Sequence, residues 1–463
     1  MATLILRRFH LVLAAVLGVC GLCAGDPAIA GVVGSGTAAS CTESALASQI
    51  AAGGTVTFNC GGAATIAMTT GISISSGSPA LVVDGGGVIT LDGATISPHQ
   101  PMISVQGGSS ALPSITFRGM TFSNGNATGT GLQAGGAILN GGNLTLDHDV
   151  FTNNQAPFGG AVMQERCSSA GSPALPCVAA SLTVTNSQFS GNSASNSGGA
   201  INLQSDTVNV SNSTFTGNSA GSGGAIYLFG NSTFTTSGTI TSSTFSGNTA
   251  TFEGGAIAVV NLQGGSATIT NNTFNANQAT GSTGAGGAIW IGSPTTLTNN
   301  TIAGNSAASG GGIDNGATLT MQDSLLANNS GGNCAGSSFS GANNLQFGDS
   351  TCNGVSVGDP HLGALANNGG PTQTMALNSG SAAVDAGDNA TCAKTDQRGT
   401  ARIDGDGNGS VVCDIGAYEA PAGTVVVPPP APAVSAPMLS RIGLLLLAGL
   451  FATLGLSAWR RRV

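Results

Sequence analysis

Charge is scarce in this chain of 463 residues: charged side chains make up 7% of it, and only 11 residues are Lys or Arg. Between residues 31 and 436, five cationic side chains stand against nineteen acidic ones, a net charge of about −14. Such a surface repels phosphate backbones, which excludes nucleic acid as a partner.

Aromatic side chains are also few, at 4%, whereas 74 residues are Gly. Gly shows no period of three, which excludes collagen. After residue 30 the cysteines form no Cys-x-x-Cys pair and the His residues are not clustered, so the sequence does not indicate a zinc site. It also has no phosphate-binding loop, cofactor fingerprint or Ser-His-Asp set.

What the chain has in abundance is a repeated two-part signature. The first part, Gly-Gly-Ala-Ile, occurs at Gly135–Ile138, Gly198–Ile201, Gly223–Ile226, Gly254–Ile257 and Gly286–Ile289. The second part, Phe-x-x-Asn, occurs at Phe151/Asn154, Phe189/Asn192, Phe215/Asn218, Phe245/Asn248 and Phe274/Asn277, with aliphatic versions at Ile302/Asn305 and Leu326/Asn329. Successive copies of the second part are 38, 26, 30, 29, 28 and 24 residues apart, which predicts a solenoid of supersecondary units.

Short alternating runs such as Leu182-Thr-Val184 and Ala267-Thr-Ile269 lie between the repeats and predict strands bounded by tight corners. Three short strands per turn, each pairing in parallel with its copy roughly 4.8 Å away, make a right-handed parallel β-helix. We expect each Phe to stack on the next inside the coil and each Asn to bond its equivalents in a ladder, both in structural roles.

The two ends carry export and sorting features. Residues 1–30 combine Arg7 and Arg8 with an apolar run and predict a signal peptide. Residues 421–436 form a Pro-rich linker, and residues 437–463 contain an apolar stretch followed by three Arg, which predicts a C-terminal transmembrane helix; a buried hydrophobic helix is the alternative.

Eight cysteines remain after the signal peptide, and they lie as four close couples. Because eight cysteines allow 105 connectivities, pairing of neighbours is a prediction from spacing alone. The predicted pairs are Cys41 with Cys60, Cys167 with Cys177, Cys334 with Cys352, and Cys392 with Cys413.

The segment Pro437-Met-Leu-Ser-Arg-Ile-Gly443, with its apolar run and Arg cluster, resembles the C-terminal protein-sorting signals of Gram-negative bacteria. Pro437, Leu439, Ser440 and Gly443 match the type that begins Pro-Thr-Leu-Ser-Glu-Trp-Gly. The resemblance implies a sorting protease as a partner, transient membrane contact through the tail, and a body at the cell surface or outside the cell.

Two further segments flank the coil, which we predict over residues 31–361. Thr42 to Ala52 predicts a short capping helix with Thr42 as its N-cap. The motifs Gly380-Ser-Ala-Ala-Val-Asp-Ala-Gly387, Asp396-Gln-Arg-Gly399 and Cys413-Asp-Ile-Gly-Ala-Tyr-Glu419 closely resemble the choice-of-anchor Q domain over residues 362–420. The repeats themselves resemble those of polymorphic outer membrane proteins, which belong to adhesins.

An enzyme on this fold would need specific groups. A lyase requires Arg or Lys as base, and a hydrolase requires paired carboxylates. Between residues 119 and 393 the sequence has one cationic side chain, Arg166, which lies in the insertion next to Glu165 and Cys167 and not on a repeated strand. The sequence does not show whether any of the acids on different turns converge: Asp206, Glu253, Asp314 and Asp323. His99 and His361 are expected to be structural.

Two acidic segments are candidate functional sites. Asp147-His148-Asp149 aligns with Asn186-Ser187-Gln188, which predicts a solvated corner. Asp404, Asp406 and Asn408 follow the first half of an EF-hand loop and predict calcium, with Asp414 as a substitute for the missing Glu at position 12, occupied by Ile415. A metal-free acidic loop is the alternative.

The sequence thus favours a non-enzymatic, exported surface or secreted protein that contacts glycans or matrix through a flank of the coil. We expect no cofactor other than calcium. The second hypothesis is a secreted polysaccharide lyase or glycoside hydrolase acting on acidic polysaccharide.

Overall fold

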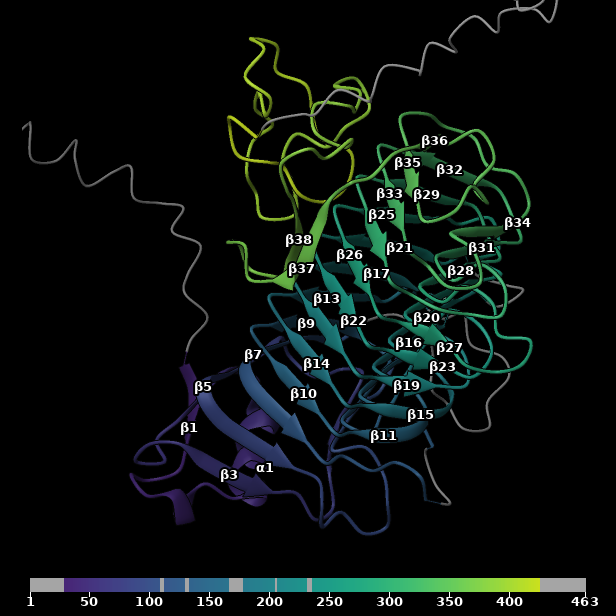
Figure 1. Ribbon diagram of the computed structural model, residues 1–463. Coiled ribbons are helices and arrows are strands. Elements are labelled where there is room, and N and C mark those ends of the chain that lie inside the picture. The colour runs from purple at the N-terminus through teal and green to yellow at the C-terminus, as the bar shows by residue number, and fades with distance from the viewer. Residues whose placement is uncertain are drawn as a thin grey trace, which may run out of the picture. The chain divides into compact units, whose positions relative to one another are not determined.

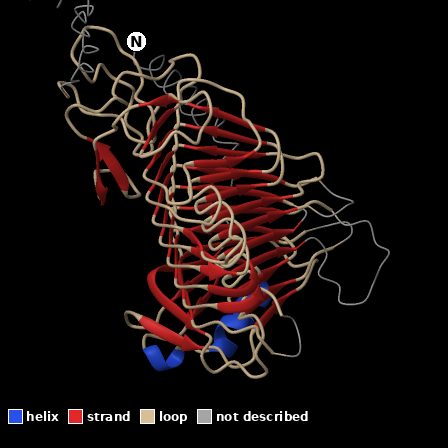
Figure 2. Ribbon diagram, turned by 45° about the vertical axis from the view of Figure 1, so that its right-hand side comes forward, coloured by secondary structure: helices blue, strands red, loops and turns tan. Residues whose placement is uncertain are grey.

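The computed structural model of the chain describes residues 29–108, 112–129, 133–165, 178–204, 206–230 and 235–424. These residues wind into a coil of short parallel strands, with irregular loops beyond its C-terminal turns (Figure 1). Figure 2 shows the strands stacked in layers, with helix at one end of the stack. The predicted parallel β-helix is confirmed.

The largest sheet, sheet A, has two columns of strands. The first column contains β1 (Ile29–Val33), β2 (Gly54–Phe58), β9 (Asn143–Asp147), β13 (Ser181–Thr185), β17 (Thr207–Ser211), β21 (Ser237–Thr241), β25 (Ala267–Thr270), β29 (Thr295–Thr298) and β32 (Leu319–Gln322). The second contains β3 (Ala64–Ala67), β10 (Val150–Thr152), β14 (Gln188–Ser190), β18 (Thr214–Thr216), β22 (Thr244–Ser246), β26 (Thr273–Asn275), β30 (Thr301–Ala303), β33 (Leu325–Ala327), β35 (Leu345–Phe347) and β36 (Ser356–Val357). The long strands β5 (Leu81–Asp92) and β7 (Ser114–Ser123) run through both columns.

Two more parallel sheets complete each turn. Sheet C is short, with β11 (Gln155–Phe158), β15 (Ser193–Ser197), β19 (Ser219–Ala220), β23 (Thr249–Ala250) and β27 (Gln278–Ala279). Sheet B contains β4 (Ile72–Ile74), β6 (Ile103–Val105), β8 (Ile138–Asn140), β12 (Val162–Glu165), β16 (Ile201–Gln204), β20 (Ile226–Phe229), β24 (Ile257–Val260), β28 (Ile289–Ile291), β31 (Ile313–Asn315) and β34 (Cys334–Gly336).

A typical turn therefore has four short strands in three sheets, where the sequence predicted three strands. The extra division is a corner in sheet A at which one residue adopts positive φ, among them His148 (57°), Asn186 (52°) and Asn271 (55°). Asn and Asp tolerate this left-handed conformation better than branched residues. The Gly-Gly-Ala-Ile motif ends the short sheet C and begins sheet B, as predicted, with its first Gly also at positive φ.

Phenylalanine fills the interior under sheet A. Six rings, from Phe122 to Phe274, stack in register with centroids 4.7 to 4.9 Å apart and planes within 10°. Ile302 and Leu326 continue the column in the next turns. All of these side chains are buried, so the predicted stack is confirmed.

The corner asparagines form the predicted ladder. The Nδ2 of Asn248 donates to Oδ1 of Asn277 at 2.9 Å and to the carbonyl of Phe215 at 2.9 Å, and the same pattern repeats from Asn154 to Asn329. Each Asn thus satisfies buried backbone groups of a neighbouring turn.

A second polar ladder, not predicted, follows the positive-φ corner. Its members are Asp149, Ser187, Ser213, Ser243, Asn272, Asn300, Ser324 and Asn344. The alignment that placed Asp147 opposite Asn186 is wrong by one residue, because Asp147 pairs with Thr185. Asp149 is therefore fully buried rather than solvated, and Asp147 and Asp149 do not share a face.

The N-terminal end is capped as predicted. Helix α1 (Glu43–Ala52) follows a 3-10 turn (Ala38–Ser40), and Thr42 accepts a hydrogen bond from the amide of Ala45 at 3.2 Å. Leu46 and Ile50 are buried in the core of the coil. The disulfides Cys41–Cys60, Cys334–Cys352 and Cys392–Cys413 are confirmed, whereas Cys167 and Cys177 lie outside the described residues.

The C-terminal segment, residues 362–424, packs sideways against sheet A. Its hairpin of β37 (Leu362–Ala366) and β38 (Thr374–Leu377) is antiparallel, and Met375 contacts Ala303 and Ala327 of the coil. Gln397 is buried between the two parts: its Nε2 donates to Thr244 Oγ1 at 3.0 Å, and its Oε1 accepts from Thr273 Oγ1 at 2.7 Å.

Within the described residues, no helix is long and apolar enough to cross a membrane. The predicted signal peptide up to Ala28, the linker from Val425 and the transmembrane sorting tail lie outside the described residues. Strand β1 begins at Ile29, two residues before the predicted start of the coil.

Candidate functional site

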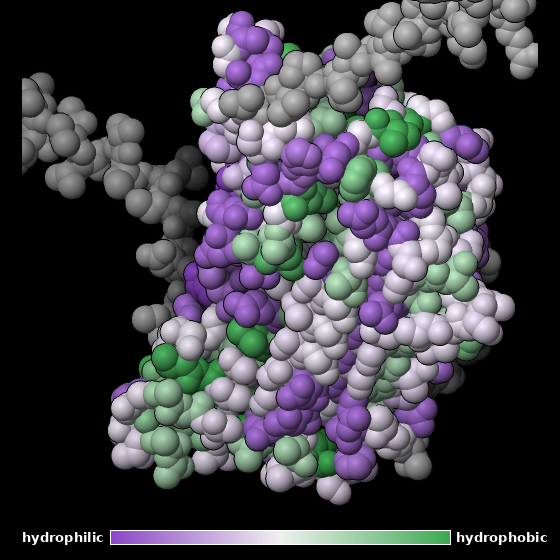
Figure 3. All heavy atoms as spheres, viewed as in Figure 1, coloured by the Kyte–Doolittle hydropathy of each residue, from purple (hydrophilic) through white to green (hydrophobic). Residues whose placement is uncertain are grey.

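The outer surface of sheet B differs from that of sheet A. In sheet A the outward rows are short hydroxyl and amide side chains, such as Thr183, Asn209, Thr239 and Thr268 in one row. Figure 3 shows much of the face that it views in pale colours, which mark residues near the middle of the hydropathy scale, with purple hydrophilic residues among them.

In sheet B the first residue of each strand points inward and the second points outward. The inward column consists of Ile except for Val162 in β12 and Cys334 in β34. The outward column over five turns is Asn202, Tyr227, Ala258, Trp290 and Asp314. Tyr227 and Trp290 are each one of two residues of their type in the sequence, and they lie two turns apart.

A second row faces this column across the Gly-Gly corner. Two hydrogen bonds fix the pairing, with Asn202 Nδ2 donating to Ser197 Oγ at 2.6 Å and Ser309 Oγ donating to Asp314 Oδ2 at 2.6 Å. The equivalent residue five positions before Ala258 is Glu253. Its turn lies between those of Tyr227 and Trp290.

We call Tyr227, Phe229, Glu253, Trp290 and Asp314 the sheet-B flank. The rings of Tyr227 and Phe229 pack with centroids 6.3 Å apart and planes at 23°. Trp290 lies over Gly292, where its ring occupies the space that a Cβ would need. Each of the three aromatic rings is half-buried, so part of its surface is accessible to a ligand.

The carboxylates of the flank interact with one another. Burial raises the pKa of Glu253, and the negative charge of Asp314 raises it further. Burial likewise raises the pKa of the Tyr227 hydroxyl, with a contribution from Glu253. The structure therefore places Glu253 and Asp314 on the same side of the coil, two turns apart, which the sequence left open.

Asn202 carries a buried polar atom for which the described residues supply no hydrogen-bond partner. The Oδ1 of Asn202, next to Tyr227 in the outward column, is buried and accepts no hydrogen bond within the described residues. A buried acceptor without a donor costs free energy, so a donor from water or a ligand would stabilise it.

A cleft lies at the N-terminal end of the same column. It has a volume of about 250 Å³ and is lined by Ser73, Ser104 and Leu139, which stand in register on β4, β6 and β8, and by Gln100 and Gln106. The outward column of sheet B thus begins in a cleft and ends at the aromatic and acidic residues of the flank.

The predicted calcium loop adopts a compact turn. Asp404 accepts from the amides of Gly407, Asn408 and Gly409, and Asn408 Nδ2 donates to Asp406 Oδ2 at 2.8 Å. One oxygen each of Asp385, Asp404 and Asp406 lies within 4.8 Å of the others, so Asp385 supplies a third carboxylate that the sequence analysis missed. Its signal was the motif Gly380 to Gly387, which carries this Asp.

Asp414 does not join this cluster. Its carboxylate accepts from the amides of Asp385 at 2.7 Å and Ala420 at 2.6 Å. Burial, followed by the charge of Glu419, raises the pKa of Asp414 to about 7. The proposed substitution of Asp414 for the position-12 Glu is therefore not what the structure places there, and calcium binding stays a prediction.

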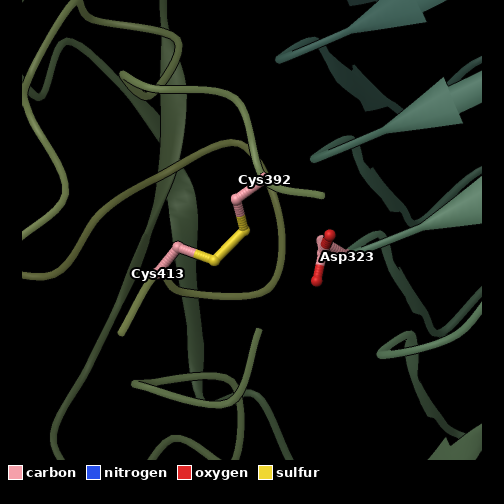
Figure 4. Close-up of side chains that lie close together, drawn as sticks. All are labelled: Asp323, Cys392 and Cys413. Carbon is pink, nitrogen blue, oxygen red and sulfur yellow. A yellow bond between two sulfur atoms is a disulfide. The ribbon is translucent and has the colours of Figure 1, made fainter. Parts of the chain in front are cut away.

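Asp323, Cys392 and Cys413 lie close together where the C-terminal segment meets the coil (Figure 4). The two cysteines are joined in a disulfide and offer no thiolate. Asp323 accepts from the amide of Asp388 at 2.9 Å and from Thr391 Oγ1 at 2.6 Å, so it holds the segment in place.

The remaining sequence candidates are dispersed. Asp206 is buried just after strand β16 and accepts from Gln164 Nε2 at 3.0 Å and from the amide of Ala180 at 2.9 Å, in line with a structural role. His361 Nδ1 lies 2.8 Å from the carbonyl of Ser379, in line with a structural role. Arg166 lies outside the described residues.

Comparison with known proteins gives two partial matches. The family described as "Right handed beta helix region" matches residues 56–240, and the Chlamydia polymorphic membrane protein repeat matches residues 242–259. No curated protein matches the chain. The chain is therefore similar to right-handed β-helix regions and carries one repeat similar to that of polymorphic membrane proteins.

Proposed function

We propose that this protein is an exported, non-enzymatic β-helix protein of the cell surface that adheres to glycans through the sheet-B flank. The observation that carries the proposal is the gathering of Tyr227, Trp290, Glu253 and Asp314 on neighbouring turns of a chain with 4% aromatic residues. Aromatic faces stack on sugar rings, and carboxylates accept hydrogen bonds from sugar hydroxyls. The match to a polymorphic membrane protein repeat supports a surface location.

We propose further that residues 362–420 are a choice-of-anchor Q-like module. Residues 437–463 would hold the exported chain in the membrane transiently, until a sorting protease recognises this tail. Matrix polymers are included among the partners. Calcium, bound by Asp385, Asp404 and Asp406 with Asn408 beside them, is proposed as a structural ion rather than a catalytic one.

A glycan array probed with the full exported chain tests the proposed function. We expect binding that falls at least about tenfold in Tyr227→Ala/Trp290→Ala and is unchanged in Thr239→Ala/Thr268→Ala, whose side chains are exposed on sheet A. Equal loss in both variants, with intact folds, would contradict adhesion through this flank.

A secreted hydrolase is the second candidate, and the coupling of Glu253 with Asp314 favours it over a lyase, because paired carboxylates serve hydrolysis. Release of reducing ends from polysaccharides is the readout. Turnover that disappears in Glu253→Gln would replace the non-enzymatic proposal with this one.

A further inference from the structure

We propose that the sheet-B flank binds a β-linked amino-sugar polysaccharide with free ammonium groups, laid lengthwise along the coil. This inference rests on the proposed glycan contact and names the ligand class.

The flank is acidic without a described cation beside it. Glu253 and Asp314 lie on it, and Glu165 ends strand β12 on the same sheet. Burial raises the pKa of Glu165 as well. Half-buried carboxylates with raised pKa values are stabilised when a cation approaches, whereas a uronate or sulfate group would add repulsion.

The aromatic residues favour the same ligand. Tyr227 and Trp290 carry the aromatic rings that face outward from β20 and β28, and an ammonium group near such a ring gains cation–π attraction. The pyranose ring that bears the ammonium supplies an apolar face for stacking. A basic peptide offers the charge without a stiff repeating ring, which is why a polysaccharide fits better.

The spacing of the flank suits a polymer. Outward residues of neighbouring turns are roughly 4.8 Å apart, so Tyr227 and Trp290 are separated by about 9.6 Å along the coil. In an extended β-linked chain each pyranose unit covers about one strand spacing. Two neighbouring sugars of a chain parallel to the axis therefore cover the distance between Tyr227 and Trp290. The part of the column with exposed side chains, from Tyr227 to Asp314, spans three such steps, about 14 Å.

The unpartnered Oδ1 of Asn202 lies in this column one turn before Tyr227. It is an acceptor, as are the carboxylates of Glu253 and Asp314. The carboxylates of Glu253 and Asp314 are accessible acceptors on the flank, and an amino sugar, whose ammonium and hydroxyl groups donate, matches them.

Titration calorimetry with four soluble hexamers tests the inference: glucosamine, N-acetylglucosamine, cellohexaose and oligogalacturonate. The full exported chain is expected to bind the glucosamine hexamer at least about tenfold more tightly than the acetylated one, with affinity that falls as salt rises. Glu253→Gln/Asp314→Asn is expected to remove this preference, Tyr227→Ala/Trp290→Ala to weaken both ligands, and Thr239→Ala/Thr268→Ala to leave both unchanged.

Circular dichroism and the melting temperature establish that each variant folds, and Trp290→Phe, which keeps a ring, is expected to retain most of the affinity. Tighter binding of N-acetylglucosamine, cellohexaose or oligogalacturonate through the flank would overturn the amino-sugar inference and leave the proposed adhesion standing. Absence of flank-dependent binding to any glycan would overturn both.

Discussion

The carboxyl group of Asp149 is enclosed at the start of the second polar ladder. It accepts from the amides of Met120 at 2.7 Å and Asp147 at 3.2 Å, and burial raises its pKa from 3.8 to about 8. Between these two pH values the unfolded chain has released the proton that the folded chain retains. Stability from this group is therefore complete below pH 3.8 and is lost as the pH rises to about 8.

Replacing Asp149 by Asn is predicted to remove this loss, because Asn272 occupies the equivalent ladder position with its Nδ2 donating to Thr270 and Ile240 carbonyls. Melting temperatures from about pH 5 to about pH 9 are expected to fall less with pH in Asp149→Asn than in the native chain. Each pKa unit corresponds to about 1.4 kcal/mol.

Asp147→Asn is the matched control for that series. Burial raises the pKa of Asp147, yet hydrogen bonds from Asn186 and Thr185 outweigh it and lower the pKa overall. The native contribution of Asp147 thus grows as pH rises through the acid range, opposite in sign to that of Asp149. Parallel pH curves for the two variants would contradict the assignment.

The proposed calcium site leads to a second prediction about single residues. The carboxylates of Asp385, Asp404 and Asp406 converge, so millimolar calcium is expected to raise the melting temperature of the native chain by mass action. Asp385→Asn is expected to reduce the shift, and Asp359→Asn, which lies outside the cluster, to leave it intact. An identical melting temperature with calcium and with chelator would rule the ion out.

Among the repeated elements, each side chain of the asparagine ladder forms hydrogen bonds with buried backbone groups of neighbouring turns. Asn248→Ala leaves the buried amide of Asn218 without its acceptor at 3.0 Å and the carbonyl of Phe215 without its donor. The expected cost is roughly 2–4 kcal/mol, since each unsatisfied buried group costs about 1–3 kcal/mol. Asn209→Ala, on an exposed outward row, is expected to be near neutral in the same denaturant titration.

The elements that the sequence predicted are those with one residue type at a fixed place. Phe and Asn recur so regularly that the sequence alone predicts the stack of Phe rings and the ladder of Asn side chains. The second ladder was missed because Asp149, Ser187 and Asn272 play the same role with different side chains. The sheet-B flank was missed because Tyr and Trp each follow a Gly-Gly-Ala-Ile motif in a single repeat, at Tyr227 and Trp290, so no period marks them.

The whole described chain is held together by contacts that no local pattern signals. Gln397 forms hydrogen bonds with Thr244 and Thr273, which lie 153 and 124 positions earlier in the sequence. Contacts over such separations leave no repeated pattern in the sequence. The C-terminal segment was therefore predicted as a module that follows the coil, and its lateral packing on sheet A required the fold.

Gln397→Ala is predicted to loosen this attachment without unfolding the coil. Hydrogen exchange is expected to rise across residues 362–424 and to stay low in strands β13 to β25, because the lost bonds all lie at the contact. Gln263→Ala, which is exposed, serves as the control. Uniform exchange in both parts would mean that the segment and the coil unfold as one unit.

Unequal turns still stay in step. Linked ladder asparagines are separated by 38, 26, 30, 29, 28 and 24 residues, yet each bond between them is 2.9 Å long. The length of the coil therefore depends on the number of turns and not on the number of residues in each turn. Duplication of one unit in the gene would lengthen the coil by about 4.8 Å. Insertion of residues into a loop would change the surface of the coil without changing its length. The length and the surface of the coil can therefore evolve independently.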